Sequence, residues 1–171
     1  MRLIYCIFAV LIALSSWSAD AQERDSYSSL SESGSDERLL LDLVNKARMQ
    51  GARCGNRYYE PAEPFFWNGK LAKAARRQCR DMSRNRFLGH RGSDGSRHSD
   101  RVSEAGYDWS SCGENICEGY ETPEDVVEGW MESEGHCKNI MNPEYREAGV
   151  ARSLGRGKRL YWTIVFGTAM Q

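Results

Sequence analysis

Three side chains in this sequence have the chemistry to bind a metal ion or transfer a proton: His90, Glu114 and His136. Each lies next to a glycine, where a side chain can face a cleft instead of the core. Two imidazoles and one carboxylate suit Zn²⁺ or another divalent cation, and such a set leaves coordination positions open. Tens of residues separate the three, so spacing alone fixes no geometry. The alternative is that both histidines are hydrogen-bonded structural residues.

Other catalytic arrangements have weaker support. No G-x-S-x-G nucleophile motif is present. Cys137 follows His136 directly, but adjacent side chains rarely face each other, and a cysteine in an exported protein tends to be oxidised. Glu132 precedes His136 by four residues, which on a continuous helix would allow a hydrogen bond, although a solvated acidic helix end is the favoured interpretation. We expect His98, which lies among polar residues, to be exposed or to cap a helix.

The N-terminus has the pattern of a secretory signal. Arg2 precedes a short apolar run, and small residues follow at Ala19 and Ala21, so residues 1–21 are predicted to be a signal peptide. The apolar run is shorter than the roughly 20 residues of a membrane span. We therefore expect a secreted protein, extracellular or periplasmic, without a transmembrane anchor after cleavage. An uncleaved N-terminal anchor is the alternative.

Composition divides the remaining chain into two parts. Residues 22–35 are rich in serine, acidic residues and glycine, which predicts a flexible leader, and residues 36–171 are long enough for one domain. The formal net charge is −1 and there is no strongly basic stripe, which excludes nucleic acid as the expected partner. Arg76, Arg77 and Arg80 are interpreted as the solvated side of a helix and not as a binding patch.

The number of cysteines agrees with the prediction that the protein is exported. Beyond the predicted signal peptide the chain contains Cys54, Cys79, Cys112, Cys117 and Cys137. Five thiols in an oxidising compartment predict up to two disulfides and one unpaired cysteine. The absence of paired CxxC motifs argues against a zinc cluster.

Apolar periodicity predicts an α+β domain. Helices are expected from a cap at Ser35 to a stop at Gly51, from a cap at Asn68, over 98–105, and from a cap at Thr122. Residues 54–67 are expected to be irregular. The predicted strands are 113–119, 148–153 and 160–166. The last is apolar on both faces, so it should lie at the centre of a small, mostly antiparallel sheet that carries helices.

Several segments in this order resemble the CAP superfamily, which groups cysteine-rich secretory proteins, antigen 5 and pathogenesis-related 1 proteins. They are LLDLVNKAR, LAKAARRQCRDM, FLGH, GENI, VVEGWMESEGHCKNIM, GVA and YWTIVFG. The resemblance extends from about Arg38 to Thr168. Residues 90–107 approximate the pattern H-x₃-D-G-x₅-R-x₃-A-G-Y, which is typical of the bacterial branch with SCP-like domains.

The resemblance implies a three-layer α-β-α sandwich and a central cavity with two histidines and two acidic residues. The histidines correspond to His90 and His136, and one acid corresponds to Glu114. The second acid falls on Ser133, which lowers the negative charge of the site and should weaken its affinity for a cation such as Zn²⁺ or Mg²⁺. The resemblance also implies a disulfide between Cys54 and the cysteine after the second cavity histidine, Cys137.

Membership of a superfamily does not define a reaction. The resemblance favours a non-catalytic binding or interaction module, with an extracellular protein, a lipid or a sterol as partner. One alternative is a metal-dependent extracellular hydrolase of the protease type that uses the same cavity, with Glu114 or Glu132 as base. Another is an extracellular structural protein in which the histidine cavity has lost its role.

Overall fold

The structure, a computed structural model, describes residues 34–170, and the residues from Asp36 onward form one compact unit. The predicted signal peptide and nearly all of the predicted leader lie outside these residues. In the described part, no helix has the length and apolar content to cross a membrane. Residues 34 and 35 are already helical, so Ser35 lies within the first helix and the prediction that it caps that helix is wrong.

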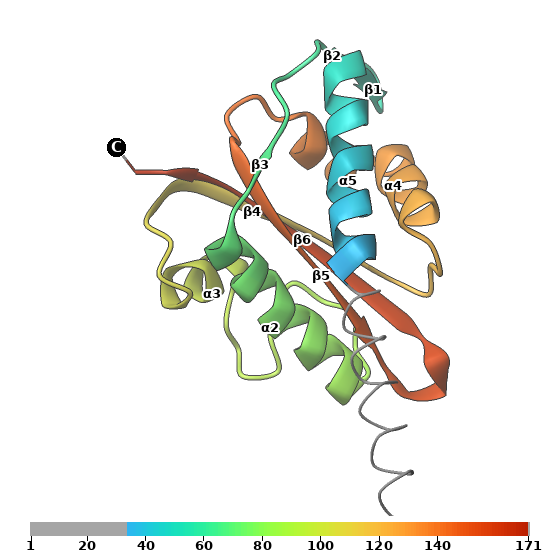
Figure 1. Cartoon of the computed structure of the whole chain (residues 1–171), viewed down its shortest axis with the longest axis vertical. Helices are drawn as coiled ribbons and strands as arrows, with labels where there is room; N and C mark the ends of the chain where they lie inside the picture. Colours follow the sequence, from blue (N-terminus) through green and yellow to red (C-terminus); the bar gives the residue numbers. More distant parts are fainter. Residues whose placement is uncertain (1–33, 171) are drawn as a thin grey trace, which may run out of the picture. The chain divides into compact units, whose positions relative to one another are not determined.

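A four-stranded sheet forms the middle of the domain, with strand order β3-β5-β6-β4 (Figure 1). The strands are β3 Phe66–Trp67, β4 Trp109–Glu118, β5 Glu147–Leu154 and β6 Leu160–Ala169. β3 pairs with β5 in parallel, whereas β4 and β5 both pair with β6 antiparallel. The central position of the last strand and the mostly antiparallel sheet are therefore confirmed.

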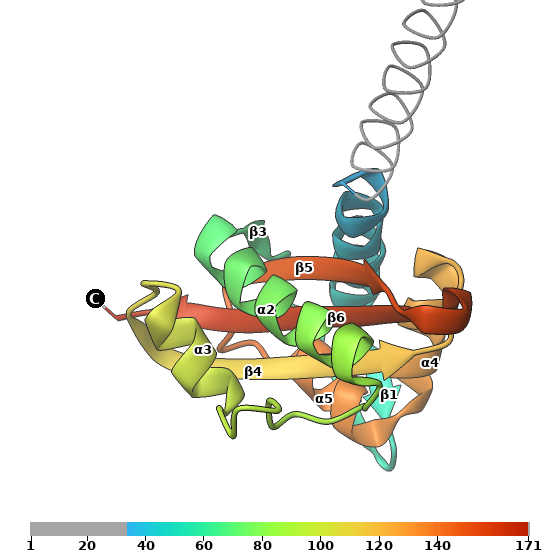
Figure 2. The same cartoon turned by 90° about the horizontal axis from the view of Figure 1, so that it is seen from below.

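Helices cover both faces of this sheet (Figures 1 and 2). α2 (Gly69–Asn85) and α3 (His98–Glu104) lie on one face. The helix over residues 34–50, α4 (Pro123–Glu132) and α5 (Glu134–Met141) pack on the other. The α+β class and the three-layer α-β-α sandwich are confirmed.

β6 supplies side chains to both cores, because successive residues of a strand point to opposite faces. Trp162, Ile164 and Phe166 pack against the side that carries the 34–50 helix, α4 and α5. Tyr161 and Val165 pack against the side that carries α2 and α3. The strand is buried on both faces, as its apolar composition predicts.

α2 is defined by a cap and by close packing on the sheet. The Asn68 side chain accepts hydrogen bonds from two backbone N–H groups of the first turn, as predicted, and the helix ends at Arg86 in the left-handed conformation. The helix backbone contacts β5 at Gly149, where a Cβ atom would lie 2.0 Å from the backbone nitrogen of Ala72. Only glycine fits there.

The segment expected to be irregular contains a small hairpin, so that prediction is wrong for part of its length. β1 (Ala52–Cys54) pairs antiparallel with β2 (Arg57–Tyr59), and Gly55 in the turn has a φ of 59°. Strands of three residues with exposed polar side chains show no alternation of apolar and polar residues, so periodicity did not identify them.

The disulfide between Cys54 and Cys137 is present and joins this hairpin to α5, which confirms the pairing implied by the resemblance. Cys79, Cys112 and Cys117 are free thiols, so the described residues contain one disulfide, not two. Cys79 packs on the α2 side of the sheet and Cys117 on the opposite side, so the sheet separates them.

Candidate functional site

Glu114 lies on β4 with its carboxylate buried between two cationic or hydrogen-bonding groups. One carboxylate oxygen, Oε1, is 3.0 Å from Nδ1 of His90, and the other, Oε2, accepts a 2.8 Å hydrogen bond from Nη2 of Arg101. The side chains of Glu114 and Arg101 are each 1% exposed. A charge buried this deeply persists because its partner and its hydrogen bonds compensate the lost hydration.

Arg101, from α3, also fixes the loop that carries His90. Its Nη2 donates a second hydrogen bond to the backbone oxygen of His90 at 3.1 Å, and its Nη1 donates to the backbone oxygen of Ser96 at 3.0 Å. Reasoning from residue chemistry did not select Arg101. The available signal was the arginine of the bacterial pattern that residues 90–107 approximate.

The contact with Glu114 sets the tautomer of His90. A carboxylate paired with Arg101 accepts hydrogen bonds, so in the neutral form of His90 the proton lies on Nδ1 and Nε2 bears a free lone pair. The His90 side chain is 54% exposed, which leaves Nε2 available to a ligand. Glu114 thus orients a histidine, and each of its carboxylate oxygens contacts one protein group.

His136 approaches from the other side of the sheet edge. Its ring centroid lies 6.4 Å from that of Trp130 on α4, and its backbone oxygen accepts a 3.0 Å hydrogen bond from the Asn115 side chain. Burial, and secondarily the charge of His90, lowers the pKa of His136 below its usual 6.5. A neutral imidazole therefore lies within electrostatic range of His90 at neutral pH.

His136 lies in the first turn of α5, a helix separate from α4. The break is at Ser133, whose extended backbone ends α4 and begins α5. Asn139, one turn further along, donates to the Asn115 side chain at 2.9 Å and to the backbone oxygen of Glu114 at 3.3 Å. The amides of Asn115 and Asn139 thereby attach α5 to β4.

The two acids beside Ser133 have other surroundings in the described part of the chain. Glu134 forms an ion pair with Lys138 at 2.5 Å, and the Glu132 side chain is exposed. Within residues 34–170 no three His, Cys, Asp or Glu side chains form a ready metal-binding group.

The third histidine, His98, is half-buried as the first residue of α3, whereas an exposed or capping residue was expected. Burial lowers its pKa below 6.5, partly offset by Glu114 and by a hydrogen bond to the Cys112 backbone. All three histidines of the sequence therefore lie in the electrostatic neighbourhood of Glu114 or of each other.

Curated proteins are similar to this chain in sequence. YkwD of Bacillus subtilis (strain 168) is 32% identical over 114 residues, which is 67% of this chain and 41% of that protein. The chain spans less than half of the curated relatives it matches.

Two solved structures have the same fold. One is an extracellular protein containing a SCP domain from Bacillus anthracis, with TM-score 0.67 and 23% identity over 79% of this chain and 41% of the other. The second is NaASP2 with Zn²⁺, with TM-score 0.56 and 14% identity over 77% and 78% of the two chains. At these identities the likeness concerns the fold alone.

A family model matches residues 41–166, most of the described domain, and its description is the cysteine-rich secretory protein family, CAP. The match includes the GENI strand with Glu114, the Trp130 helix and the turn that carries His136. This chain belongs to the CAP family of cysteine-rich secretory proteins.

Proposed function

We propose that this chain is a secreted, non-catalytic binding module in which His90 and His136 together hold a divalent cation. The observation that carries the proposal is the contact between Glu114 and Nδ1 of His90, which leaves Nε2 as a free donor. Histidines that bind metals commonly donate their second ring nitrogen to a carboxylate in this way.

The other contacts agree with a cation held by two histidines. The lowered pKa of His136 keeps its lone pair free at neutral pH. Imidazole nitrogen favours Zn²⁺ over Mg²⁺, and water would supply the remaining ligands. The relative NaASP2 with Zn²⁺ shares the fold and is consistent with that choice. With Ser133 in place of an acid and Arg101 behind Glu114, the positive surroundings make a modest affinity the expected one.

The geometry supports binding more than hydrolysis. A general base needs a free carboxylate or imidazole within reach of a metal-bound water. The Glu114 carboxylate already contacts His90 and the Arg101 guanidinium, and Glu132, the other candidate base, is exposed at the end of α4. An extracellular protein, lipid or sterol partner remains a prediction from the family resemblance, as does secretion itself.

Calorimetric titration of the metal-free secreted protein with Zn²⁺ tests the cation site. We expect one equivalent to bind, with affinity reduced at least about ten-fold in His90→Ala and in His136→Ala. The matched control is His98→Gln, which removes the third histidine and should leave the affinity unchanged.

Two results would contradict the proposal. One is the absence of Zn²⁺ binding by the unmodified protein, and the other is an equal loss in the His98→Gln control. Peptide and ester substrates supplied with Zn²⁺ should remain intact; turnover that disappears in His90→Ala would favour the hydrolase instead.

A further inference from the structure

Two neighbouring residues of β4 hold the two histidines from opposite faces of the sheet. The Glu114 carboxylate contacts Nδ1 of His90, and the Asn115 side chain donates a 3.0 Å hydrogen bond from Nδ2 to the backbone oxygen of His136. Successive side chains of a strand point to opposite faces, so Glu114 points toward α3 and Asn115 toward α5. One peptide unit of β4 therefore links the attachment points of His90 and His136.

The Asn115 amide is held in one orientation by Asn139 of α5. Nδ2 of Asn139 donates to Oδ1 of Asn115 at 2.9 Å and to the backbone oxygen of Glu114 at 3.3 Å. If either amide turned over, it would place two acceptors or two donors against each other. Asn115 is 0% exposed, so solvent water does not replace these contacts. The hydrogen bonds therefore fix both amides and, through Asn115, the backbone at His136.

The first turn of α5 is held by contacts outside the helix. α5 contains eight residues, and within the described part of the chain no side-chain hydrogen bond caps its start at Ser133. The disulfide at Cys137 joins this turn to the β1–β2 hairpin and not to β4. The ring of His136 lies 6.4 Å from that of Trp130, whose Nε1 donates to the β4 backbone at Ile116. The separation of these two rings therefore reports the position of α5 relative to β4.

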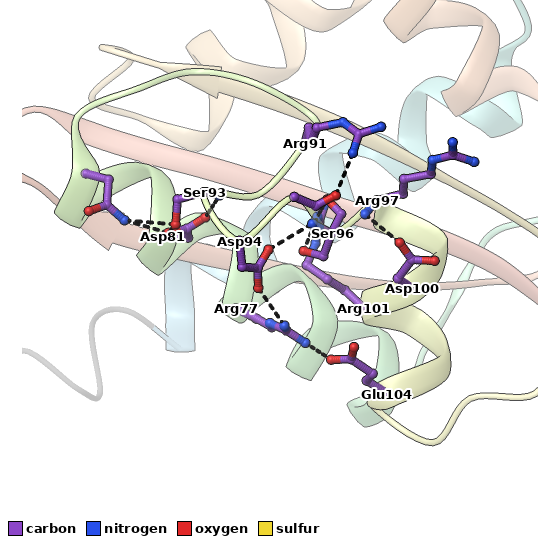
Figure 3. Close-up of polar contacts among 12 residues, drawn as sticks. Arg77, Asp81, Arg91, Ser93, Asp94, Ser96, Arg97, Asp100, Arg101 and Glu104 are labelled. Carbon is purple, nitrogen blue, oxygen red and sulfur yellow. Dashed lines mark hydrogen bonds and ion pairs between the residues drawn. The ribbon is translucent and has the colours of Figure 1, made fainter.

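The loop that carries His90 is held by separate contacts. Arg101 of α3 donates to the backbone oxygens of His90 and Ser96. Figure 3 shows Asp94 between Ser96 and Arg77: the carboxylate accepts a 2.9 Å hydrogen bond from the Ser96 backbone and a 2.8 Å hydrogen bond from Arg77 of α2. These contacts lie on the α2 and α3 side of the sheet, so a change in α5 leaves them in place.

We infer that Asn115 and Asn139 are positioning residues for the proposed cation site, because they set the separation of His136 from His90. This inference rests on the proposed function, since it concerns the same two histidines. Removing the Asn139 amide leaves both imidazoles in the protein but releases α5 from β4. Groups that orient metal ligands typically change metal affinity by roughly 10–100-fold when they are removed.

Asn139→Leu, which nearly keeps the size of the side chain and removes its hydrogen bonds, tests this inference in two ways. In the metal-free protein with its disulfide intact, the nuclear Overhauser effect between the ring protons of His136 and Trp130 should weaken, because α5 is no longer attached to β4. In a calorimetric titration, the affinity for Zn²⁺ should fall at least about ten-fold. Asn139→Ala, which adds no apolar bulk, should give the same two changes and replaces the leucine variant if that variant fails to fold.

The matched control is Asn142→Leu, at the C-terminal end of the same helix. The Asn142 side chain accepts a 3.0 Å hydrogen bond from the backbone N–H of Glu144, which is not part of β4. This control removes an amide from α5 but should keep both the Overhauser effect and the Zn²⁺ affinity of the unmodified protein. A purely structural role of Asn139 would make the two leucine variants behave alike.

Three results separate the possible failures. An unchanged Overhauser effect in Asn139→Leu and Asn139→Ala would overturn the inference, whether or not the metal binds. Equal losses of Zn²⁺ affinity in Asn139→Leu and Asn142→Leu would overturn it as well. Failure of the unmodified protein to bind Zn²⁺ would refute the proposed function instead, and the Overhauser effect would still decide whether Asn139 positions His136.

Discussion

The buried pair between Glu114 and Arg101 gives the sharpest stability prediction. Glu114→Gln keeps the size of the side chain and one acceptor for Arg101, but it removes the charge that compensates the guanidinium. Arg101→Gln leaves the carboxylate uncompensated instead. Both side chains are 1% exposed, so water cannot replace the lost partner.

Breaking a buried ion pair from one side costs about 3–5 kcal/mol in the free energy of unfolding. The hydrogen bond from His90 remains available to Glu114 and those to Ser96 and His90 remain available to Arg101, so we expect the lower end, about 3 kcal/mol, for each single variant. The double variant Arg101→Gln/Glu114→Gln contains no buried charge at this position. It should be more stable than the sum of the single losses predicts, by about 2 kcal/mol of coupling.

Urea unfolding with the disulfide intact, followed by far-ultraviolet circular dichroism, measures these values. The more exposed pair between Glu118 and Arg159, also 2.8 Å long, provides the control, and Glu118→Gln should cost less than about 1 kcal/mol. Additive losses in the double variant, or a Glu114→Gln loss no larger than that of Glu118→Gln, would refute the assignment of a tightly coupled buried pair.

Two further predictions concern packing and pH. Gly149→Ala should lower the free energy of unfolding by about 3 kcal/mol, because its Cβ would contact the backbone of Ala72 at 2.0 Å. Gly135→Ala, with open space around its Cβ, is the control and should change the free energy little. Equal shifts of the thermal midpoint in the two variants would contradict this account. Burial lowers the pKa of His98 and of His136 in the folded state, so the unfolded chain binds more protons below pH 6.5 and stability should fall as the pH falls through that range. Urea midpoints at pH 5, 6 and 7 should show this slope, and it should flatten in His98→Gln/His136→Gln; a slope unchanged in that variant would assign the effect to other groups.

Long elements with a strong local signal were predictable from the sequence. Helix α2 has a capping asparagine and a regular buried face, and β6 is apolar on both faces, so local chemistry and periodicity agree with the tertiary structure. The β1–β2 hairpin and the separate helix α5 were not predictable in this way. Their stability depends on the disulfide and on Asn139 bonding to β4, contacts distant in sequence that local periodicity does not contain.

Part of the candidate site was also predictable from the sequence, and part was not. Residue chemistry selected His90, Glu114 and His136 as candidate ligands, and the structure adds that Glu114 contacts His90 with one oxygen and Arg101 with the other. Residue chemistry did not select Arg101, because its burial depends on α3 packing against β4. Tertiary packing decides whether a charged residue such as Arg101 is buried, and neither composition nor spacing predicts that burial. The pattern over residues 90–107 indicated the role of Arg101 indirectly. It contains both His90 and Arg101, and the Arg101 side chain donates a hydrogen bond to the backbone oxygen of His90.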